Sequence, residues 1–440
     1  MNDALSQLNW PRVDLESQCL IDREILNEST PSNLSFYYID ISAVTSGRIS
    51  IPSNKIAFRG APSRARKVVR DGDVLMATVR PNLKAFAYAY LPNDNFVAST
   101  GFTVLTAKEC SDAKFLLYSI LSDDVTKQID ELVVGSNYPA INIRNVRRLR
   151  INAPGPREQR KIAAILTTVD NLIERTEALI AKYQALKQGL MHDLFTRGVD
   201  ARGQLRPSQA DAPELYKETA LGWIPKEWLV LPAMKICSEI TKGTTPQTMY
   251  DEYEASTVPF IRVQNLSFDG TLLFDEQPSF VSNFTHNTFL ARSKGVPGDV
   301  LMNIVGPPMG KVSVIPKAYP EWNINQAIAL FRTMNPNDSG FLMHFLLSDS
   351  AFRWLISRAK RTSGQTNLTL ELCRELPVPR PNEDERIRIA NLLNKASDRI
   401  ACEQLTLNKL RSLKSGLMQD LLTGKVRVKV DEDAGASVHA

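Results

Sequence analysis

The chain has 440 residues and a mass of 49.2 kDa, a length that predicts two to four domains. Apolar residues make up 43% and charged residues 23%, a composition that excludes global disorder, a collagen-like fibre and a disulfide scaffold. Lys and Arg outnumber Asp and Glu by 53 to 48, and the resulting net charge of +5 permits an anionic partner without requiring one.

The cysteines and the first residues predict where the protein resides. The five cysteines form no CxxC pair and are odd in number, which indicates reduced thiols: Cys19, Cys110, Cys237, Cys373 and Cys402. The start, MNDALSQLNWPR, lacks a basic segment followed by an apolar one, and no run of about 18 apolar residues occurs. We therefore expect a soluble cytoplasmic protein with no membrane partner.

The chain repeats itself. The segment LKQGLMHDLFTRGV at residues 186–199 matches LKSGLMQDLLTGKV at residues 413–426, an offset of 227 residues. Weaker matches lie upstream, such as GDVLM at residues 72–76 and 298–302. The sequence therefore predicts two tandem copies of one unit, each a diverged block of about 150 residues followed by a better-matched helix of about 40.

Each copy ends in a helix with a 3.5-residue apolar repeat, which predicts a coiled-coil seam. The alternative is that each helix packs only on its own block, but about 40 residues give a helix of about 60 Å, longer than such a block needs. The predicted seam residues are Ile162, Leu166, Val169, Ile173, Ile180, Tyr183, Leu190 and Leu194 in the first helix and Ile389, Leu393, Ile400, Leu407, Leu410, Leu417 and Leu421 in the second.

Two glycines occupy matching positions inside these helices, Gly189 and Gly416. A glycine in a helix interior costs about 1 kcal/mol relative to alanine. Its presence in both copies predicts a close approach of backbones at a helix crossing, and the alternative is that the helix frays there.

The predicted fold class is mixed α/β (α+β), with two tandem globules separated by a long antiparallel two-helix coiled coil and related by a pseudo-two-fold. Short β-branched runs between turns predict strands in the globules, for example at residues 36–41, 74–79 and 312–315. The predicted domains are globule 1 at residues 1–153, a first long helix at 154–198, a linker at 199–222, globule 2 at 223–380, a second long helix at 381–426 and a flexible tail at 427–440.

The sequence lacks the motifs of the common nucleotide-using and metal enzymes. GPPMGK at residues 306–311 has the wrong spacing for a phosphate loop and is interpreted as a turn. None of the four histidines has a second ligand at metal spacing, and His344 lies in an apolar stretch typical of a core. Asp73 and Asp299 in the repeated GDVLM are interpreted as turn residues that bind backbone amides. We therefore expect a binding or assembly protein with no catalytic residue and no metal site.

Positive charge gathers locally in both globules. Residues 48–84 contain nine basic side chains opposed only by Asp71 and Asp73. In globule 2, residues 350–370 contain four basic side chains and no acidic one. Basic groups bind phosphates, and Arg, Asn and Gln recognise base edges, so a nucleic-acid surface is one interpretation. An ordinary solvated surface is the other.

The tandem arrangement resembles a known family. The LGWIPKEW segment at residues 221–228, the PGPREQ helix start at residues 154–159 and GLMxDLxT at both helix ends are similar to the specificity subunit of type I restriction-modification systems. The likeness extends from about Trp10 to Val426. The second helix start, PNEDE at residues 381–385, lacks the Gln that follows Glu158 in the first.

The resemblance implies that each globule is a target-recognition domain reading one half of a bipartite double-stranded DNA target. The helices would set the gap between the halves and dock two methylation subunits, and motor-nuclease restriction subunits would complete the complex. S-adenosylmethionine, ATP and Mg would bind those partners and not this chain. Charge and loop position then select candidate DNA contacts: Arg59, Arg64, Arg66, Lys84, Lys242, Arg262, Gln264, Lys360, Arg361 and Gln365. A coiled-coil adaptor that presents two protein-binding globules is the alternative function.

Overall fold

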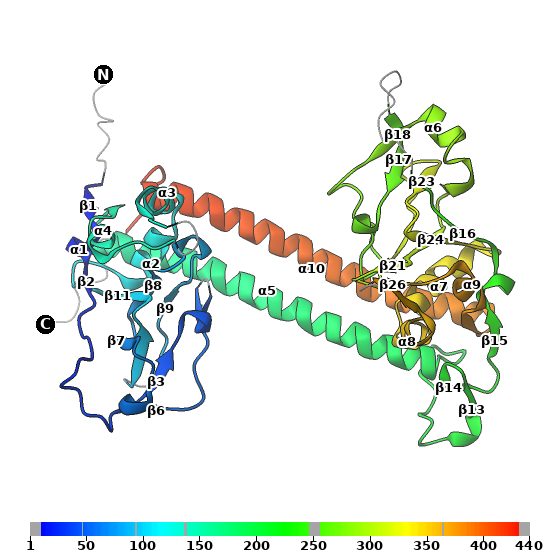
Figure 1. Ribbon diagram of the computed structural model, residues 1–440, viewed down its shortest axis with the longest axis horizontal. Helices are drawn as coiled ribbons and strands as arrows, with labels where there is room; N and C mark the ends of the chain where they lie inside the picture. Colours follow the sequence, from blue (N-terminus) through cyan, green and yellow to red (C-terminus); the bar gives the residue numbers. More distant parts are fainter. Residues whose placement is uncertain are drawn as a thin grey trace, which may run out of the picture. The chain divides into compact units, whose positions relative to one another are not determined.

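The computed structural model describes residues 10–45, 47–92, 95–135, 139–245, 256–362 and 365–430. Two compact units are present. Unit 1 consists of Met1–Glu177 and Leu405–Ala440, and unit 2 consists of Ala178–Gln404. The two long helices, α5 (Pro156–Thr196) and α10 (Glu383–Thr423), each contribute residues to both units (Figure 1).

Unit 1 contains a four-stranded antiparallel sheet at the centre of its main apolar core. Its strand order is β2 (Cys19–Ile21), β11 (Phe102–Ala107), β8 (Val74–Ala77) and β9 (Phe86–Tyr88). Every residue of β8 is buried on one face of the sheet or the other. The strand is therefore apolar throughout and does not alternate between apolar and polar residues. Helix α2 (Ala113–Leu121) packs on this sheet, and Leu116, Leu117 and Ile120 enter the same core.

A second four-stranded sheet completes globule 1. Its order is β6 (Ile56–Ala57), β3 (Ser35–Ile39), β10 (Phe96–Ser99) and β7 (Ala65–Val69), with β3 and β10 parallel and the other pairs antiparallel. Shorter elements surround the two sheets: β1 (Arg12–Asp14) paired with β12 (Arg150–Asn152), β4 (Val44–Thr45) paired with β5 (Arg48–Ile49), and helices α1 (Leu15–Gln18), α3 (Asp123–Leu132) and α4 (Ile143–Arg147).

Globule 2 repeats both sheets in the same order and with the same strand directions. The first is β16 (Cys237–Lys242), β24 (Ile328–Thr333), β20 (Val300–Asn303) and β22 (Val312–Val314), all antiparallel. The second is β18 (Phe280–Ser282), β17 (Ser256–Ile261), β23 (Trp322–Ile324) and β19 (Lys294–Gly295), with β17 and β23 parallel. The predicted internal repeat and the mixed α/β class are confirmed.

Further elements of unit 2 follow the same plan with additions. They are β13 (Tyr216–Thr219) with β14 (Gly222–Pro225), β15 (Leu229–Pro232) with β27 (Pro377–Arg380), a three-stranded sheet of β21 (Val305–Gly306), β26 (Gln365–Asn367) and β25 (Lys360–Thr362), and helices α6 (Asn283–Asn287), α7 (Ser339–Leu346), α8 (Asp349–Arg358) and α9 (Leu370–Glu375).

Serine divides the helical stretch of each globule at the same place. Ser122 accepts a hydrogen bond from the Val125 amide and begins α3, and Ser348 accepts one from the Ala351 amide and begins α8. A serine at this position satisfies an amide that the first helical turn leaves unpaired. The helical stretch at residues 339–358 is therefore divided into two helices.

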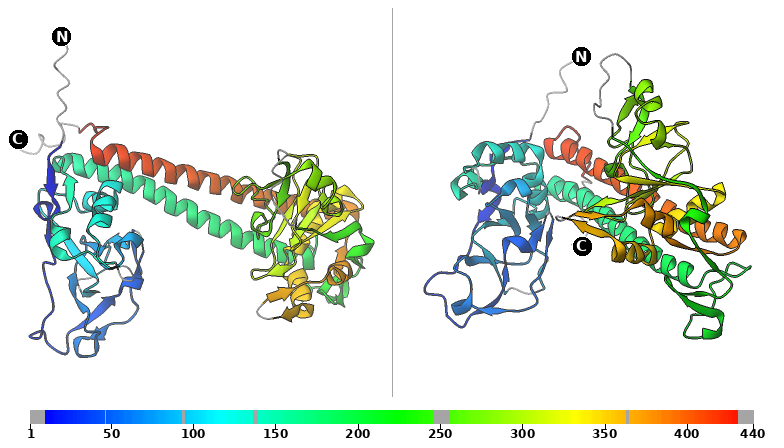
Figure 2. Two further views of the ribbon diagram at one scale, coloured as in Figure 1. Left: turned by 45° about the horizontal axis from the view of Figure 1, so that its top comes forward. Right: turned by 45° about the vertical axis from the view of Figure 1, so that its right-hand side comes forward.

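Within each unit, parts of the two long helices run side by side and antiparallel (Figures 1 and 2). In unit 1, Ile162 and Leu166 near the start of α5 share a core with Leu421 and Leu422 near the end of α10. In unit 2, Met191, Leu194 and Phe195 near the end of α5 share a core with Ile389 and Leu393 near the start of α10. The predicted antiparallel pairing is confirmed in both units.

Ion pairs also link the two long helices within unit 1. Lys414 contacts Asp170 across the helix pair at 2.6 Å, and Arg411 contacts Glu177 at 2.8 Å. All fifteen predicted seam residues are buried or half-buried. The expectation of close backbone approach at Gly189 and Gly416 is wrong, because a Cβ built at either glycine meets no atom within 4 Å and both residues are exposed.

Candidate nucleic-acid interface

Three candidate DNA contacts of globule 1 lie on or beside its second sheet. Arg59 is exposed on a short 3₁₀ turn that follows β6, and Arg64 is exposed just before β7. Arg66 lies on β7, where its guanidinium stands 5.0 Å from the centre of the Phe58 ring and donates to the carbonyl of Ala65 at 2.8 Å. The structure therefore brings Arg66 and the turn that carries Arg59 together.

Much of the local positive charge in residues 48–84 is neutralised by acids from elsewhere in the chain. Lys67 forms a nearly buried ion pair with Asp22. Arg70 pairs with Glu24 at 2.8 Å, and Arg48 pairs with Glu174 of helix α5 at 3.0 Å. None of these acids lies within residues 48–84. The net charge counted over those residues is therefore higher than the net charge of this surface.

Lys242, Arg262 and Gln264 lie on globule 2. Lys242 is exposed at the end of β16. Arg262 precedes a short 3₁₀ turn, and its backbone amide donates to Oδ1 of the buried Asn265 at 2.8 Å. Gln264 on the same turn donates to Oε1 of Gln277 at 2.8 Å. Arg262 and Gln264 therefore lie within one turn that a buried asparagine holds in place.

The remaining candidates occupy one element that occurs in both globules, which we call the loop–hairpin element. In globule 1 it consists of the loop 79–85 between β8 and β9, which an antiparallel bridge between Val79 and Ala140 joins to a later part of the chain. In globule 2 it consists of the loop 305–311 between β20 and β22 and the hairpin of β25 and β26, joined through β21.

The loop–hairpin elements carry four of the candidate residues. Lys84 lies in the loop of globule 1, where its Nζ donates to the carbonyl of Leu121 at 3.4 Å. Lys360, Arg361 and Gln365 lie on strands β25 and β26 of globule 2, and their side chains fall outside the described part of the chain. The candidate in globule 1 and the three candidates in globule 2 therefore lie on equivalent elements of the repeat.

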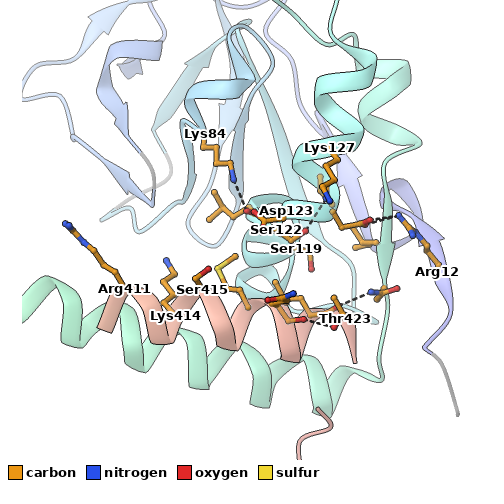
Figure 3. A pocket seen from close by; sticks show the side chains of 18 residues that line it. Arg12, Lys84, Ser119, Ser122, Asp123, Lys127, Arg411, Lys414, Ser415 and Thr423 are labelled. Carbon is orange, nitrogen blue, oxygen red and sulfur yellow. Dashed lines mark hydrogen bonds and ion pairs between the residues drawn. The ribbon is translucent and has the colours of Figure 1, made fainter. Parts of the chain in front are cut away.

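Lys84 also lines a cavity of about 690 Å³ in unit 1 (Figure 3). Its walls come from helices α2 and α3 on one side and α10 on the other, with Arg12, Lys127, Arg411 and Lys414 at its edge. Two of these cations are engaged in other ion pairs described above, and Arg12 contacts Asp124 at 2.9 Å. The cavity is thus lined by positively and negatively charged side chains, and the positively charged ones are more numerous.

The equivalent cavity of unit 2 is nearly filled and measures about 20 Å³. Phe195 stands there at the position that Leu422 occupies in unit 1. Its ring packs edge-on against Phe341 and Phe345, with ring centres 5.4 and 5.6 Å apart. The two copies therefore differ at this place, with a leucine in unit 1 and a larger, tightly packed phenylalanine in unit 2.

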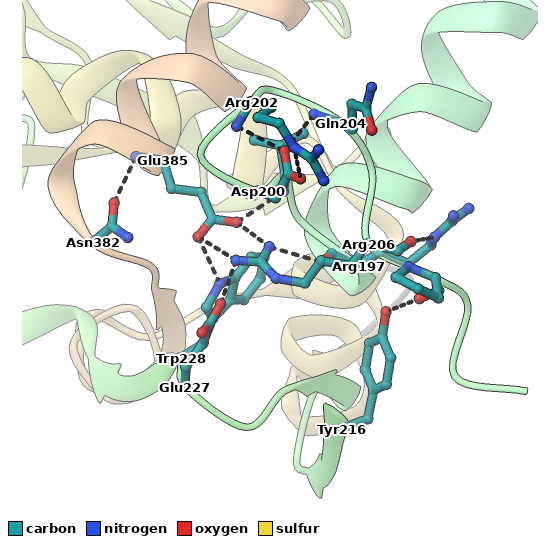
Figure 4. A network of polar contacts seen from close by, with 12 residues as sticks. Arg197, Asp200, Arg202, Gln204, Arg206, Tyr216, Glu227, Trp228, Asn382 and Glu385 are labelled. Carbon is teal, nitrogen blue, oxygen red and sulfur yellow. Dashed lines mark hydrogen bonds and ion pairs between the residues drawn. The ribbon is translucent and has the colours of Figure 1, made fainter. Parts of the chain in front are cut away.

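A buried polar network joins the linker of unit 2 to the start of helix α10 (Figure 4). The carboxylate of Glu385, almost fully buried, accepts hydrogen bonds from the Val199 amide at 2.9 Å, from Nε1 of Trp228 at 3.2 Å and from the guanidinium of Arg206 at 3.0 Å. Burial alone would lower the pKa of Arg206, but the hydrogen bonds and charge of Glu385 and the charge of Glu227 raise it. The network therefore carries a fixed ion pair.

A related network joins the start of helix α5 to the segment after α10 in unit 1. Glu158, which matches Glu385 in the repeat, accepts hydrogen bonds from Nε and a terminal nitrogen of Arg427 at 2.7 and 3.0 Å. The Arg427 guanidinium lies 5.1 Å from the centre of the Trp10 ring. Each unit thus joins the first turn of one long helix to the segment that follows the other.

The fold shows the structural roles of several further polar residues. Asp73 accepts from the Arg70 amide and Asp299 from the Val296 amide, both at 2.8 Å, so the GDVLM aspartates are turn residues as predicted. Lys187 is buried, burial lowers its pKa, and its Nζ donates to the carbonyl of Asp269 at 3.0 Å. Lys311 was interpreted only as part of a turn, and its ammonium lies 5.8 Å from the centre of the exposed Phe268 ring.

The chain belongs to the family of the type I restriction modification DNA specificity domain. The model of this family matches twice, at residues 36–184 and 225–412, and each match covers one globule together with much of the helix that follows it. A DNA-specificity protein of a type I restriction-modification system is therefore the class that the sequence and its two-copy fold define. No metal site of three or more His, Cys, Asp or Glu side chains occurs among the described residues, and none of the described helices is apolar enough over a sufficient length to span a membrane.

Known proteins of this class are similar to the chain over most of its length. The specificity subunit of the type I restriction enzyme MjaVIII from Methanocaldococcus jannaschii is 23% identical over 370 residues, which are 82% of this chain and 81% of that one. The S subunit of a type I restriction-modification system from M. genitalium has a similar fold, with a TM-score of 0.57 and 17% identity over 96% of this chain and 98% of that one. A chain from a study of assembly and conformational transition in the type I R-M system gives a TM-score of 0.55 at 23% identity, over 96% of this chain and 99% of that one.

Proposed function

We propose that the chain is the specificity subunit of a type I restriction-modification complex and that each globule reads one half of a bipartite double-stranded DNA target. The observation that carries the proposal is the repeat itself. Two sheets of identical strand order occur in each globule, while the residues of the connecting loops differ between the copies. One scaffold with two sets of loop residues suits two different half-sites.

The long helices would fix the separation of the half-sites and bind two methylation subunits. Each helix is continuous over 41 residues, and apolar contacts hold their paired stretches together in both units. A continuous paired helix holds its two ends at a fixed distance, whereas a flexible linker does not. Motor-nuclease subunits would join the same complex. S-adenosylmethionine, ATP and Mg would bind those partners, and this chain would contribute recognition but no catalytic group.

Sequencing of methylated sites provides the direct test. We would express this chain with its methylation subunit in a host that lacks other methylases and map the modified adenines. The proposal predicts methylation at one split motif whose two halves are separated by a constant number of base pairs. Methylation spread over unrelated sequences would contradict it.

A binding measurement separates DNA recognition from an adaptor role. The assembled methylase should bind a duplex carrying the mapped motif more tightly than a scrambled duplex. Because cations released from phosphates drive such binding, the logarithm of the association constant should fall linearly with the logarithm of salt concentration, by about 0.9 per phosphate contacted. A stable complex with methylation subunits but without this dependence would favour the adaptor.

A further inference from the structure

The loops of the two loop–hairpin elements share one backbone feature and differ in their side chains. The loop 79–85 reads VRPNLKA, and the equivalent loop 305–311 reads VGPPMGK. Lys84 in the first loop, at φ +49°, and Gly310 in the second, at φ +94°, lie in the left-handed region at positions that match in the repeat, whereas Arg80, also at φ +49°, has no left-handed counterpart in the second loop. The end of the loop is therefore similar in both globules, while its start and the residues that it displays differ.

Buried hydrogen bonds hold the loop of globule 2 in one conformation. The side chain of Asn303 is fully buried. Its Nδ2 donates to the carbonyl of Pro308 at 2.7 Å, and its Oδ1 accepts from the amide of Lys311 at 2.8 Å. Because both the nitrogen and the oxygen of the buried Asn303 amide are hydrogen-bonded to the loop backbone, they fix its conformation. The backbone at Lys311 therefore has a defined position.

The neighbouring loop that carries Phe268 is fixed as firmly. The amide of Val312 donates to the carbonyl of Ser267 at 2.9 Å, and Lys187 of helix α5 donates to the carbonyl of Asp269. Burial alone would raise the pKa of Asp269, but hydrogen bonds from Ser267 and Thr271 lower it, so the carboxylate stays charged and closes the turn. Phe268 is nevertheless 56% exposed.

These fixed loops display apolar groups beside a lysine. Phe268 and Phe352 are both exposed, Lys311 lies over the Phe268 ring, and a Cβ at Gly310 would stand 3.1 Å from the Phe352 ring. The loop–hairpin element of globule 1 also displays apolar groups with a lysine, but different ones, since Leu83 is 66% exposed and adjoins Lys84. Rigidly displayed apolar side chains next to a cation are typical of surfaces that meet another molecule.

We propose that the loop–hairpin element, together in globule 2 with the neighbouring loop that carries Phe268, is the surface with which each globule contacts double-stranded DNA. Lys311 would bind a phosphate, while Phe268 would pack against bases and sugars in a groove, and Lys84 and Leu83 would do the same in globule 1. The difference between an aromatic and an aliphatic contact at equivalent places would help the globules read different half-sites. This inference rests on the proposed function and names the site through which it acts.

The charges of the surface favour DNA as the occupant over an apolar protein segment. The described basic residues of helix α8, Arg353 and Arg358, are exposed, and Phe352 precedes them. The adjoining strands β25 and β26 carry Lys360 and Arg361 and no acidic residue. A dense array of phosphates complements such a surface because it is anionic along its whole length.

The test uses the chain assembled with its methylation subunits and a duplex carrying the mapped target. We would compare Phe268→Ala and Lys311→Gln with two control variants, Phe289→Ala and Lys317→Gln. Phe289 is an equally exposed phenylalanine that follows α6, and Lys317 is an exposed lysine beyond the opposite end of β22. Complex assembly is checked for every variant by size-exclusion chromatography.

Phe268→Ala should lower affinity for the target about 5- to 150-fold and reduce discrimination in only one half of the motif. Lys311→Gln should weaken binding to all sequences and reduce the magnitude of the salt slope by about 1. Leu83→Ala should affect the other half of the motif. The controls should match the wild type.

Three outcomes would overturn parts of the argument in distinguishable ways. Wild-type affinity and discrimination in Phe268→Ala and Lys311→Gln would reject the loop–hairpin site while leaving the proposed function intact. Loss of methylation subunits from the Phe268→Ala complex would assign this surface to a protein partner. A wild-type complex that does not distinguish target from scrambled DNA would reject the proposed function itself.

Discussion

Nε1 of Trp228 donates a hydrogen bond to the carboxylate of Glu385 at 3.2 Å, deep inside unit 2. The tryptophan belongs to the LGWIPKEW segment where globule 2 begins, and the glutamate belongs to the first turn of helix α10. A segment that contributed to the family resemblance thus contacts the start of the second long helix. Both side chains are 1% exposed, so the contact is shielded from water.

Glu385→Gln should destabilise the protein strongly. The substitution keeps the shape of the side chain but leaves the guanidinium of Arg206 without its buried counter-charge, a change that typically costs roughly 3–5 kcal/mol. The matched variant Glu158→Gln should cost only on the order of 1 kcal/mol, because Arg427 is half exposed and water replaces part of the lost interaction. Urea unfolding followed by tryptophan fluorescence measures both, and equal losses would show that the two networks are energetically alike.

Leu407→Asp should disrupt the helix pair of unit 1, and Leu405→Asp should not. Leu407 is 4% exposed, whereas Leu405, two residues earlier on the same helix, is 63% exposed. A buried carboxylate with no partner costs several kcal/mol, and a surface substitution usually changes stability by less than about 0.5 kcal/mol. Thermal unfolding monitored by circular dichroism at 222 nm compares the variants. A wild-type melting temperature for Leu407→Asp would mean that the helices do not depend on each other.

His344 should make the protein less stable at mildly acidic pH. Its side chain is fully buried, Nε2 contacts Oδ1 of Asn394 at 2.8 Å, and burial lowers its pKa to about 4. The unfolded chain binds a proton near pH 6.5 while the folded chain does not, so stability falls as the pH decreases from about 6.5 to about 4. The loss contributed by this residue is on the order of 3 kcal/mol.

The variant His344→Gln isolates this contribution. Glutamine can reach Asn394 but does not titrate in this range. The difference in unfolding free energy between the variant and the wild type should therefore change between pH 7 and pH 4, in favour of the variant at the lower pH. A difference that stays constant with pH would show that His344 is not the titrating group.

Thiol labelling should divide the five cysteines into two classes. Cys19, Cys237 and Cys373 are buried, and burial raises the pKa of each to about 12, so their thiolates are scarce at neutral pH. Cys110 and Cys402 are exposed. A maleimide reagent should modify two thiols in the native protein and all five after denaturation, as counted by mass spectrometry. Rapid modification of a third thiol would indicate local opening of a core.

Repetition and periodicity in the sequence were sufficient to predict the architecture. The 3.5-residue repeat identified the faces on which α5 and α10 pair, because burial along a helix depends on a period that the sequence displays directly. The offset of 227 residues predicted equivalent globules, and both sheets recur in order. The close approach expected at Gly189 and Gly416 failed because a glycine in a helix shows only that a side chain is absent, and not what lies opposite.

The candidate interface was harder to predict because it depends on contacts distant in the sequence. Counting charges between residues 48 and 84 could not show that Asp22 and Glu24 neutralise Lys67 and Arg70. The sequence shows Lys311 only as part of a turn, since only the fold places Phe268, more than 40 residues earlier, beneath its ammonium. The DNA bases that such a surface would recognise depend on groove geometry, and that geometry is a property of the DNA as much as of the chain.

The turn shared by Lys84 and Gly310 has a practical consequence for engineering. In globule 2, buried hydrogen bonds from Asn303 hold the backbone of the loop. The exposed side chains of this surface can therefore be randomised without changing the sheet below, and the other globule stays as it is. A library confined to Phe268 and Lys311 would thus vary a small area of a single globule, and each selected variant is expected to change the methylation motif in one of its two halves.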